Sequence, residues 1–503
     1  MDLYGQVPEN FPQLRELNGR RVLFVDGEPF IILGLQWDCD GCYTNEDMDP
    51  FFAHAERMNL NTASLLLYWR EIEPEEGKYS FTMLDHRIEM ARKHNLKIVL
   101  VWFASYKNAC MTYAPDYIRE DHNTYRKVRD KNGKELINQC CPLSENTHKR
   151  DELAVIEIFN HLKEIDSEQH TVILFQMENE AGVLQTDRCY CDVCNAKYRP
   201  EDYAGYGVRA HEAFTAECIT NYSDSLANTA KAIYPLPIYV NAWLESCWQN
   251  SVAGFDYPSG GPVVAMLPVY YKTMKHIDFV APDVYQYSYK DFHYYCDAYS
   301  AEGNPLFLAE CATGVGARTE KNVFYAVGKY AAIGFDPWSI SRNCPDFMGI
   351  PLVSIANGRW SEEAYELQKS YKMIREAMFP IAMAQNTDNL GVFVQEEGDR
   401  GTKIPFGKID AVVQFSHPKN SARGLIVRLS DDEFLCIGHG VSIHFSTDGG
   451  AKIPITRAEQ GKYDGQRWVP GYRLARERET WDPVSFLDCR IVKITLDIAA
   501  IDK

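Results

Sequence analysis

The chain lacks most of the features that mark membrane, secreted or nucleic-acid-binding proteins. Its longest apolar runs, such as IVLVWFA at 98–104, fall far short of the roughly 18 residues that a bilayer-crossing helix needs. The N-terminal MDLYGQVPENFPQL (1–14) has no basic region followed by an apolar core, so no secretion signal is evident. Lys and Arg number 52 against 70 Asp and Glu, a formal charge of −18. We therefore expect neither a membrane nor a nucleic-acid partner.

A glycine-rich phosphate loop is also missing after the first apolar segment, and there is no internal repeat or low-complexity segment. The content of 46% hydrophobic and 24% charged residues is that of a globular protein. A length of 503 residues allows a large α/β barrel together with a smaller domain. Fifteen cysteines without a secretion signal favour a reducing cytoplasm, where clustered cysteines hold metal more often than they form disulfides.

Short apolar runs alternate with helical patterns over the first 385 residues. Continuous apolar strands separated by helices indicate a parallel sheet that is covered on both faces. The runs that read as strands are 29–37, 61–69, 96–103, 171–178, 237–243, 277–285, 305–310 and 334–340. Eight units of about 40 residues favour closure into a (β/α)8 barrel over an open doubly wound sheet.

The pattern changes near residue 385. Residues 359–385 predict one long helix that closes the barrel. Beyond it, short strands such as GLIVRL (424–429) and VSIHFS (441–446) are punctuated by Gly, Asp and Pro, with no convincing helix between them. The sequence therefore predicts an α/β TIM barrel over 1–385 and a small all-β, sandwich-like domain over 386–503.

Two of the predicted strands end in glutamate. FQMENE ends the fourth strand with Glu180, and PLFLAE ends the seventh with Glu310. Functional side chains of such a barrel lie at the C-terminal ends of the strands, so both can face one pocket. Glycosidic cleavage uses two carboxyl groups, of which one protonates the leaving oxygen while the other attacks the anomeric carbon or activates water. The alternative, solvated loop residues, is weakened by the pairing and by Asn179 directly before Glu180.

These residues carry a family resemblance. Asn-Glu at the end of strand four with Glu at the end of strand seven is similar to clan A of the retaining glycoside hydrolases. Longer strings resemble family 35-type bacterial β-galactosidases with a β-rich C-terminal domain. These strings are LYWREIEPEEGKYSF (67–81), VWFASYKN (101–108), VRDKNGKEL (128–136), CPLSE (141–145), HTVILFQMENEAG (170–182), GLIVRLSDDEFLCIGHGVSIHFS (424–446) and WVPGYRL (468–474).

The resemblance implies an exo-acting retaining hydrolase that removes terminal β-D-galactose from small oligosaccharides or β-glycosides. It implies Glu180 as acid/base, Glu310 as nucleophile and Asn179 as a ligand of the sugar 2-hydroxyl, with Glu178 deeper as a supporting group. Burial and a neighbouring charge are expected to raise the pKa of Glu180 and keep it protonated. No organic cofactor is expected. Related enzymes are often homo-oligomers, and a homo-oligomer is expected on that ground alone.

Further substrate-binding residues are predicted at other strand tips. Tyr285, after the sixth strand, is expected to donate a hydrogen bond to Glu310. Trp338, on the eighth strand, is expected to stack on the apolar face of a sugar, with a core tryptophan as the alternative. Trp69 and Lys107, after strands two and three, are candidates for the pocket against plain packing or rim roles.

A cysteine cluster follows Glu180 in RCYCDVCNAKY (188–198). Cys189, Cys191 and Cys194 supply three thiolates, and a closed tetrahedral zinc site needs a fourth ligand. Cys110 is the first choice because it follows the neighbouring third strand, and Cys140 or Cys141 could replace it. The set is similar to the zinc cluster of family 42 β-galactosidases. A structural zinc is therefore expected, with free thiols or a redox role as the alternatives.

Two other functions stay open. The first keeps the enzyme class but changes the sugar: a β-mannosidase, β-glucosidase or another exo-β-glycosidase of the clan. The second is a non-catalytic carbohydrate-binding protein whose β domain is the binding module. The presence of both Glu180 and Glu310 argues against it, because a binding-only barrel needs no paired acid and nucleophile. The sequence does not define the linkage, the oligomeric state or the role of the β domain.

Overall fold

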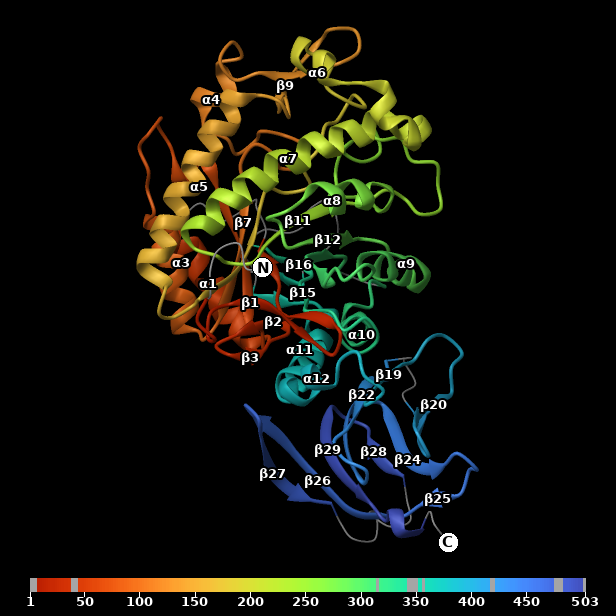
Figure 1. The fold of residues 1–503 in the computed structure, drawn as a ribbon. Helices are drawn as coiled ribbons and strands as arrows, with labels where there is room; N and C mark the ends of the chain where they lie inside the picture. Colours follow the sequence, from red (N-terminus) through yellow and green to blue (C-terminus); the bar gives the residue numbers. More distant parts are fainter. Residues whose placement is uncertain are drawn as a thin grey trace.

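A barrel of parallel strands forms the larger part of the protein (Figure 1). The computed structural model describes residues 7–37, 44–313, 316–341, 352–354, 358–416, 421–474 and 483–500. In chain order, the barrel strands are β4 (Ile32–Leu33) with β5 (Gln36–Trp37), β6 (Thr62–Tyr68), β7 (Lys97–Phe103), β10 (Val172–Gln176), β11 (Ile238–Trp243), β12 (Phe279–Val284), β13 (Phe307–Leu308) with β14 (Glu310–Cys311), and β15 (Gly334–Phe335) with β16 (Trp338–Ser341). Parallel pairing of β15 with both β13 and β4 brings the last strand position beside the first. The predicted (β/α)8 barrel is confirmed.

Burial on both faces explains why the strands read as unbroken apolar runs. On β6, Leu66 and Tyr68 belong to the core inside the barrel, whereas Leu65 and Leu67 pack on the side of the helices. The same alternation holds for β7, where Val99 faces inward. A strand that buries successive side chains on opposite faces is therefore mostly apolar along its length.

Helices cover the outside of the barrel. They are α1 (Asn45–Arg57), the short α2 (Trp69–Ile72), α3 (Thr82–Lys93), α5 (Glu145–Asp166), α7 (Ala210–Ile233), α8 (Leu267–Thr273) preceded by η2 (Val264–Met266), α9 (Tyr289–Tyr299), and α10 (Thr319–Phe324) with η3 (Tyr325–Lys329). None of the described helices combines the length and the apolar character needed to cross a membrane.

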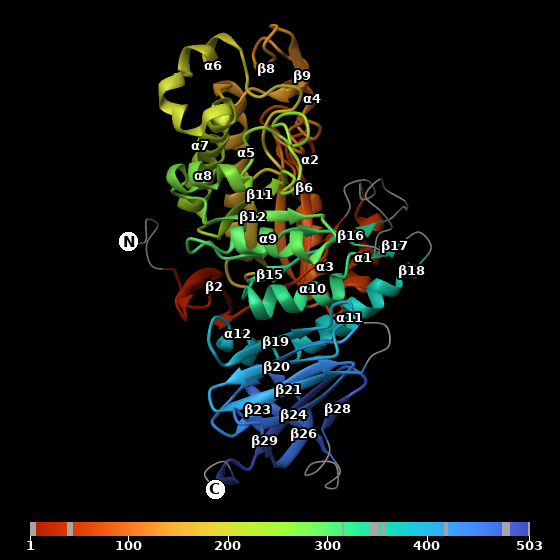
Figure 2. The same cartoon turned by 90° about the vertical axis from the view of Figure 1, so that its right-hand side faces the viewer.

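The two ends of the barrel carry different additions. An antiparallel hairpin of β1 (Gln13–Leu17), β2 (Arg20–Val25) and β3 (Glu28–Pro29), which the sequence did not predict, places Leu23 and Val25 in the core inside the barrel. The segments after β7 and β10 form an outgrowth at the far end of the molecule from the β-rich C-terminal part (Figures 1 and 2). It contains α4 (Asp116–Glu120), β8 (Lys127–Arg129), β9 (Glu135–Cys140), α6 (Asp192–Lys197) and η1 (Pro200–Arg209).

The single long helix expected over 359–385 is wrong. The structure has a short strand pair, β17 (Val353–Ser354) and β18 (Arg359–Trp360), and then two helices, α11 (Glu362–Arg375) and α12 (Met378–Ala384). Pro380 explains the break, because it has no N–H for the carbonyl of Glu376 and its ring clashes with that carbonyl in a continuous helix. The freed Glu376 carbonyl accepts a hydrogen bond of 2.7 Å from the backbone N–H of Tyr463.

The described C-terminal part is almost entirely β, as the sequence predicted. One sheet orders its strands β19 (Leu390–Val394), β22 (Arg423–Arg428), β23 (Glu433–His439), β29 (Arg490–Leu496), β26 (Ile455–Asp464) and β27 (Arg467–Arg473). The other contains β20 (Gly401–Phe406), β21 (Ile409–Phe415), β24 (Val441–Thr447), β25 (Lys452–Ile453) and β28 (Val484–Phe486). Phe393, Phe434 and Phe445 belong to a separate core within this part. A turn of 3₁₀ helix, η4 (Ile498–Ala500), follows β29.

The β-rich part is packed firmly onto the barrel. Leu425 of β22 belongs to the same apolar core as Leu367 of α11. Arg423 is fully buried and forms an ion pair of 2.9 Å with Glu366. Lys321, in α10, donates to the backbone carbonyl of Gln395 at 3.0 Å. The predicted division between residues 385 and 386 stays a prediction; α12 ends at Ala384 and β19 begins at Leu390.

Candidate active site

Three carboxyl groups meet at the C-terminal ends of the barrel strands. Glu180 follows β10, Asp283 lies on β12, and Glu310 begins β14. One oxygen from each lies within 4.8 Å of the other two, and the exposed fractions of Glu180, Asp283 and Glu310 are 6%, 2% and 7%. The predicted meeting of Glu180 and Glu310 is confirmed. Asp283 is an additional member that the sequence did not identify.

The backbone after β10 separates the two glutamates of the QMENE stretch. Glu178 and Glu180 both adopt left-handed conformations, with φ of 63° and 47°. Non-glycine residues in this region are strained by about 1–3 kcal/mol each, and such strain gathers at functional sites. Glu178 turns toward the loop after β7, where it accepts hydrogen bonds from the backbone N–H groups of Ser105 (3.3 Å) and Tyr106 (2.8 Å). It is therefore the deeper supporting group that the sequence predicted.

Asn179 and Asn241 hold the acid end of this turn in place. The Oδ1 atom of Asn179 accepts from Gln176 at 3.0 Å and from Asn241 at 3.1 Å. Its Nδ2 donates to Asn108 Oδ1 at 3.3 Å. The backbone N–H of Glu180 donates to Asn241 Oδ1 at 2.8 Å. Because these amides are buried and bonded to one another, the position of Glu180 is defined by three neighbouring barrel strands.

Electrostatics make Glu180 a proton donor. Burial, followed by the charge of Glu310, raises its pKa to about 8, which confirms the predicted direction. The positive charge of Lys107 opposes this rise, so Lys107 lies near the carboxyl groups as the sequence suggested. Lys107 Nζ also lies 4.9 Å from the ring centroid of Phe103. A carboxyl group with this pKa keeps its proton at neutral pH.

Tyr285 contacts the second carboxyl group. Its hydroxyl donates a hydrogen bond of 2.5 Å to Glu310 Oε2, which confirms the predicted contact. Burial and then the charge of Glu310 hold the pKa of Tyr285 well above its usual value. The phenol therefore stays protonated and serves as a fixed donor to one oxygen of Glu310, leaving the other oxygen available.

The tryptophans fall into two groups. Trp338 begins β16 and is half-buried, with its carbonyl accepting a hydrogen bond of 2.7 Å from Thr313. Trp69 is fully buried, and its indole N–H donates to Glu73 at 2.9 Å. Its ring centroid lies 6.3 Å from that of Trp102. These contacts favour the packing role that the sequence left open beside the pocket role, because the chain turns into α2 at this position.

Trp243 is a mouth residue that the sequence analysis missed. It ends β11, two positions after Asn241 and four after Tyr239, so it points to the same side of the strand as these interior residues. Unlike them it is 37% exposed. In the parallel pairing of β11 with β12, Trp243 lies opposite Asp283. The strand-end position in PIYVNAW was the available signal, since it is the same signal that identified Glu180 and Glu310.

Four buried thiols form a second cluster, in the outgrowth. The Sγ atoms of Cys141, Cys189, Cys191 and Cys194 all lie within 4.8 Å of one another. Cys141 Sγ lies 3.7 Å from Cys191 Sγ and 3.5 Å from Cys194 Sγ. Four ligands about 2.3 Å from a tetrahedral zinc would lie about 3.8 Å apart, whereas a disulfide would need about 2.0 Å. The thiol set therefore fits a zinc ion.

Cys110 lies outside this cluster, and Cys141 replaces it as the fourth thiol. The chain makes a tight turn after β7 in which Lys107 bridges to Cys110. It then runs outward through α4 and the β8–β9 hairpin, which delivers Cys141 to the α6 segment. The two loops do meet at Lys107 and Asn179, but the cysteine segment lies farther along the chain, beyond the reach of Cys110. Backbone N–H groups of Arg129 and Cys194 donate to the sulfurs of Cys189 and Cys191 at 3.5 Å, an arrangement that stabilises thiolates.

Comparison with known proteins finds that part of the barrel is similar to glycoside hydrolases. Residues 43–256 match the family model for glycoside hydrolase family 42, described as beta-galactosidase. Residues 367–475 match a model described as a domain of unknown function, DUF5597. These matches support clan A, with family 42 as the matched family. They do not support the family 35 resemblance of the sequence motifs; the cysteine cluster was the feature that pointed to family 42.

Curated relatives match over part of their length. Beta-galactosidase LacZ of Lactobacillus acidophilus is 26% identical over 146 residues, which is 29% of this chain and 20% of that protein. Beta-galactosidase Pbg of Clostridium perfringens is 28% identical over 189 residues, which is 37% of this chain and 22% of that protein. The chain therefore matches about a fifth of the length of these relatives.

Solved structures agree on the barrel fold. The β-galactosidase of the Antarctic haloarchaeon Halorubrum lacusprofundi gives a TM-score of 0.53 at 16% identity, covering 69% of this chain and 58% of that one. A catalytic mutant of Gan42B, a GH42 β-galactosidase of G. stearothermophilus, gives a TM-score of 0.52 at 15% identity over 70% of this chain and 57% of that one. At this identity the likeness shows the fold.

Proposed function

We propose that the protein is a retaining exo-β-glycosidase that removes terminal β-D-galactose from small oligosaccharides or β-glycosides. The observation that carries this proposal is the buried pair Glu180 and Glu310, whose oxygens lie within 4.8 Å of each other. Retaining enzymes place their carboxyl groups about 5–5.5 Å apart, whereas inverting enzymes leave room for a water molecule at about 6.5–9.5 Å. The names of the matched relatives support galactose as the sugar.

The geometry leads to a two-step reaction. Glu180 gives its proton to the glycosidic oxygen while a Glu310 oxygen bonds to the anomeric carbon, so the aglycone leaves as an alcohol. Tyr285 keeps one oxygen of Glu310 engaged and directs the other toward the sugar. In the second step Glu180 takes a proton from water, whose oxygen bonds to the anomeric carbon as the Glu310–sugar bond breaks. Configuration is retained and both carboxyl groups return to their initial state.

Substrate binding is assigned to residues around the pair. Asn179 would bind the sugar 2-hydroxyl, with its amide already oriented by Asn241 and Gln176. Trp338 and Trp243, which are both partly exposed, would stack on apolar sugar faces. Lys107 would contact a sugar hydroxyl or the acid itself, because its charge acts on Glu180.

We further propose that Cys141, Cys189, Cys191 and Cys194 hold a structural zinc ion. A closed four-thiolate site supplies folding energy and leaves no open position for substrate. The site would tie the β8–β9 hairpin to the segment that follows Glu180. A metal assay should find one zinc per chain, and Cys141→Ser should lower both zinc content and melting temperature. Cys110→Ser serves as the matched control that retains the metal, and equal zinc loss in both variants would contradict this assignment.

A panel of nitrophenyl glycosides tests the sugar. The β-galactoside should give the largest kcat/KM, with β-glucoside and β-mannoside weaker. A preference for either of these would keep the mechanism and change the sugar. Hydrolysis of no glycoside, together with measurable binding of galactose, would instead favour a carbohydrate-binding protein. The division at residues 385 and 386, a homo-oligomeric state and a cytoplasmic location stay predictions from the sequence.

A further inference from the structure

Asp283 is a buried acid that the two-step reaction does not use. It lies on β12, where its backbone register pairs with Glu310 of β14. Its Oδ2 accepts a hydrogen bond of 2.7 Å from Asn241 Nδ2. Its Oδ1 is buried and finds no hydrogen-bond donor among the described protein groups. A carboxylate oxygen that is buried without a donor loses its hydration without compensation, so an ionised Asp283 would be destabilising at this position.

The neighbours of Asp283 are mostly acids. Glu180 and Glu310 each place a carboxyl oxygen within 4.8 Å of one of its own, and Lys107 is the cation whose charge reaches it. The other titratable groups that its charge acts on are Tyr239, Tyr285, Tyr299 and Cys311. All four are neutral near pH 7, because burial raises their pKa values. When Glu310 carries the charge required of a nucleophile, a second and third carboxylate beside it have too little compensation, and they retain protons.

Asn241 cannot supply the missing donor. Its Oδ1 accepts from the Glu180 backbone, while its Nδ2 is shared between Asn179 Oδ1 and Asp283 Oδ2. The neighbouring side chain that can pair with Asp283 is that of Glu180, which places a carboxyl oxygen within 4.8 Å of one of the Asp283 oxygens. Burial, followed by the charges of Glu310 and Glu180, raises the pKa of Asp283 well above its usual value, so Asp283 keeps a proton at neutral pH.

We propose that Asp283 is a positioning residue that keeps its proton throughout the catalytic cycle and donates a hydrogen bond to the Glu180 carboxyl group. The inference rests on the proposed function, since it assigns a partner to the acid/base of that reaction. When Glu180 gives its proton to the glycosidic oxygen, the Asp283 O–H stabilises the carboxylate that results. In the second step the same bond persists while Glu180 takes a proton from water. Asp283 itself neither gains nor loses a proton.

The role of Asp283 accounts for a site that contains three acids and only one charge. A buried carboxylic acid that stays neutral can donate a hydrogen bond where a carboxylate would repel. It also limits how far burial raises the pKa of Glu180, so that the acid can still release its proton. The side chain at position 283 must therefore be uncharged, donate one hydrogen bond to Glu180 and offer one oxygen that accepts from Asn241. A carboxyl group meets this need, and so does a primary amide.

Asp283→Asn provides the decisive test because asparagine has the shape and hydrogen bonding of the protonated acid. Its Nδ2 can donate to Glu180 while its Oδ1 accepts from Asn241. We expect kcat on the best nitrophenyl glycoside to stay within about threefold of that of the unsubstituted protein. The fall of kcat/KM at high pH (the basic limb), which reports the ionisation of Glu180, should occur at the same pH in both proteins. If Asp283 were ionised, the substitution would remove a negative charge beside Glu180 and move the basic limb to lower pH by about one unit or more, which would overturn the proposal.

Asp283→Leu removes the donor at similar volume. We expect kcat to fall about 100-fold, with the basic limb moved to higher pH because the Glu180 carboxylate loses its hydrogen bond. Wild-type kcat and an unchanged limb in this variant would also overturn the proposal. Thermal unfolding of both variants checks the fold, and Asp283→Asn alone still decides the matter if the leucine variant does not fold. Absence of turnover in the unsubstituted protein would overturn the proposed function and this inference together, whereas normal turnover there with loss in Asp283→Asn overturns the inference alone.

Discussion

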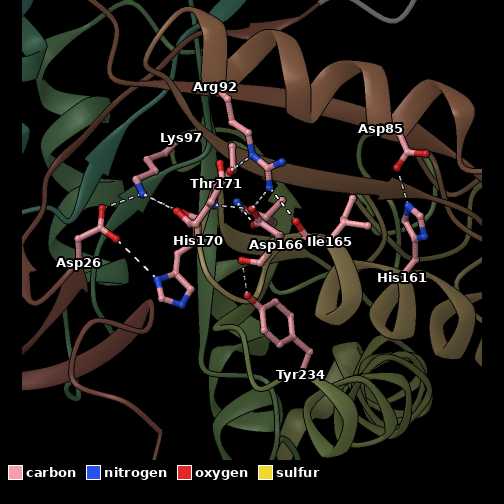
Figure 3. A network of polar contacts seen from close by, with 12 residues as sticks. Asp26, Asp85, Arg92, Lys97, His161, Ile165, Asp166, His170, Thr171 and Tyr234 are labelled. Carbon is pink, nitrogen blue, oxygen red and sulfur yellow. Dashed lines mark hydrogen bonds and ion pairs between the residues drawn. The ribbon is translucent and has the colours of Figure 1, made fainter.

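The two ends of the barrel treat buried acids in opposite ways. At the N-terminal end of the strands, Asp166 is fully buried and pairs with Arg92 at 2.7 Å (Figure 3). It also accepts hydrogen bonds from the backbone N–H groups of Thr171 (2.9 Å) and Val172 (2.7 Å). At the C-terminal end, Glu180, Asp283 and Glu310 lie within 4.8 Å of one another, and none of the described ion pairs includes any of them.

The paired end connects distant parts of the chain. Figure 3 shows Lys97, at the start of β7, between Asp26 of the N-terminal hairpin and the carbonyl of His170. Tyr234, at the end of α7, donates to the backbone carbonyl of Asp166 at 3.3 Å. These contacts satisfy the polar groups where helices α5 and α7 meet the strands. They hold this end of the fold together.

The difference shows where this fold stores instability. A buried charge with an oppositely charged partner and satisfied hydrogen bonds is tolerated, whereas a buried acid without such a partner destabilises the folded state when it is ionised. In this barrel, buried acids without a cationic partner lie at the C-terminal ends of the strands, whereas Asp166 at the N-terminal ends is paired with Arg92. Barrels of this kind generally carry catalysis at the C-terminal ends of their strands and stability at the other end. Substitutions at the two ends should therefore separate activity from stability.

Glu310→Gln should have the largest effect, and it should fall on activity. Removal of the nucleophile should lower kcat by at least about 10⁴-fold, while the melting temperature stays the same or rises because a buried charge is lost. Initial rates on the best glycoside and a thermal melt measure both. Substantial remaining activity would contradict the assignment of Glu310.

Asp166→Ala should have the opposite profile. Loss of its carboxylate leaves Arg92 and two backbone N–H groups without their partner, and we expect the free energy of unfolding to fall by about 4 kcal/mol. The kcat of the folded fraction should be unchanged. The matched control is Asp116→Ala, whose exposed ion pair with Arg119 should contribute little. Equal unfolding free energies for the two variants would remove the distinction between the barrel ends.

Glu180→Gln should show how much the ionisation of Glu180 lowers the free energy of unfolding as the pH rises. The pKa of Glu180 is raised to about 8 in the folded protein from a usual value of 4.5, so the folded state binds the proton more tightly and its stability falls as pH rises between these values. The variant should match the unsubstituted protein at about pH 5 and exceed it by roughly 4 kcal/mol at about pH 9. Glu75→Gln, at an exposed position, should show no such dependence. A pH-independent difference would contradict the raised pKa.

Much of the barrel was predictable because its strands are buried on both faces. Each predicted strand range contains a barrel strand, since a short unbroken apolar run between helical patterns is typical of a strand in a covered parallel sheet. The N-terminal hairpin was missed because its residues alternate only weakly in polarity, as QLREL over 13–17 shows. The predicted helix over 359–385 failed because the effect of Pro380 on the preceding turn was not considered.

The pairing of Glu180 with Glu310 was predictable from their positions at strand ends, although Trp243, which also ends a strand, was missed. Glu180 and Glu310 follow apolar runs directly, so their position in the barrel followed from the strand count. Asp283 and Asn241 lie inside strands, where a polar residue reads as an interruption until the register is known. Cys141 depended on the path of the long segment between β7 and α5, which no local pattern encodes.

Covalent trapping with a 2-deoxy-2-fluoro-β-D-galactoside bearing a good leaving group tests the central claim most directly. The inhibitor lets the first step proceed and slows the second, so a glycosyl-enzyme accumulates. Intact mass should increase by one fluorosugar per chain, and peptide mapping should place it on Glu310 in the PLFLAE segment. The adduct should not form in Glu310→Gln. Labelling at another residue, or turnover of galactosides without any adduct, would contradict the pairing of Glu180 with Glu310 as acid and nucleophile.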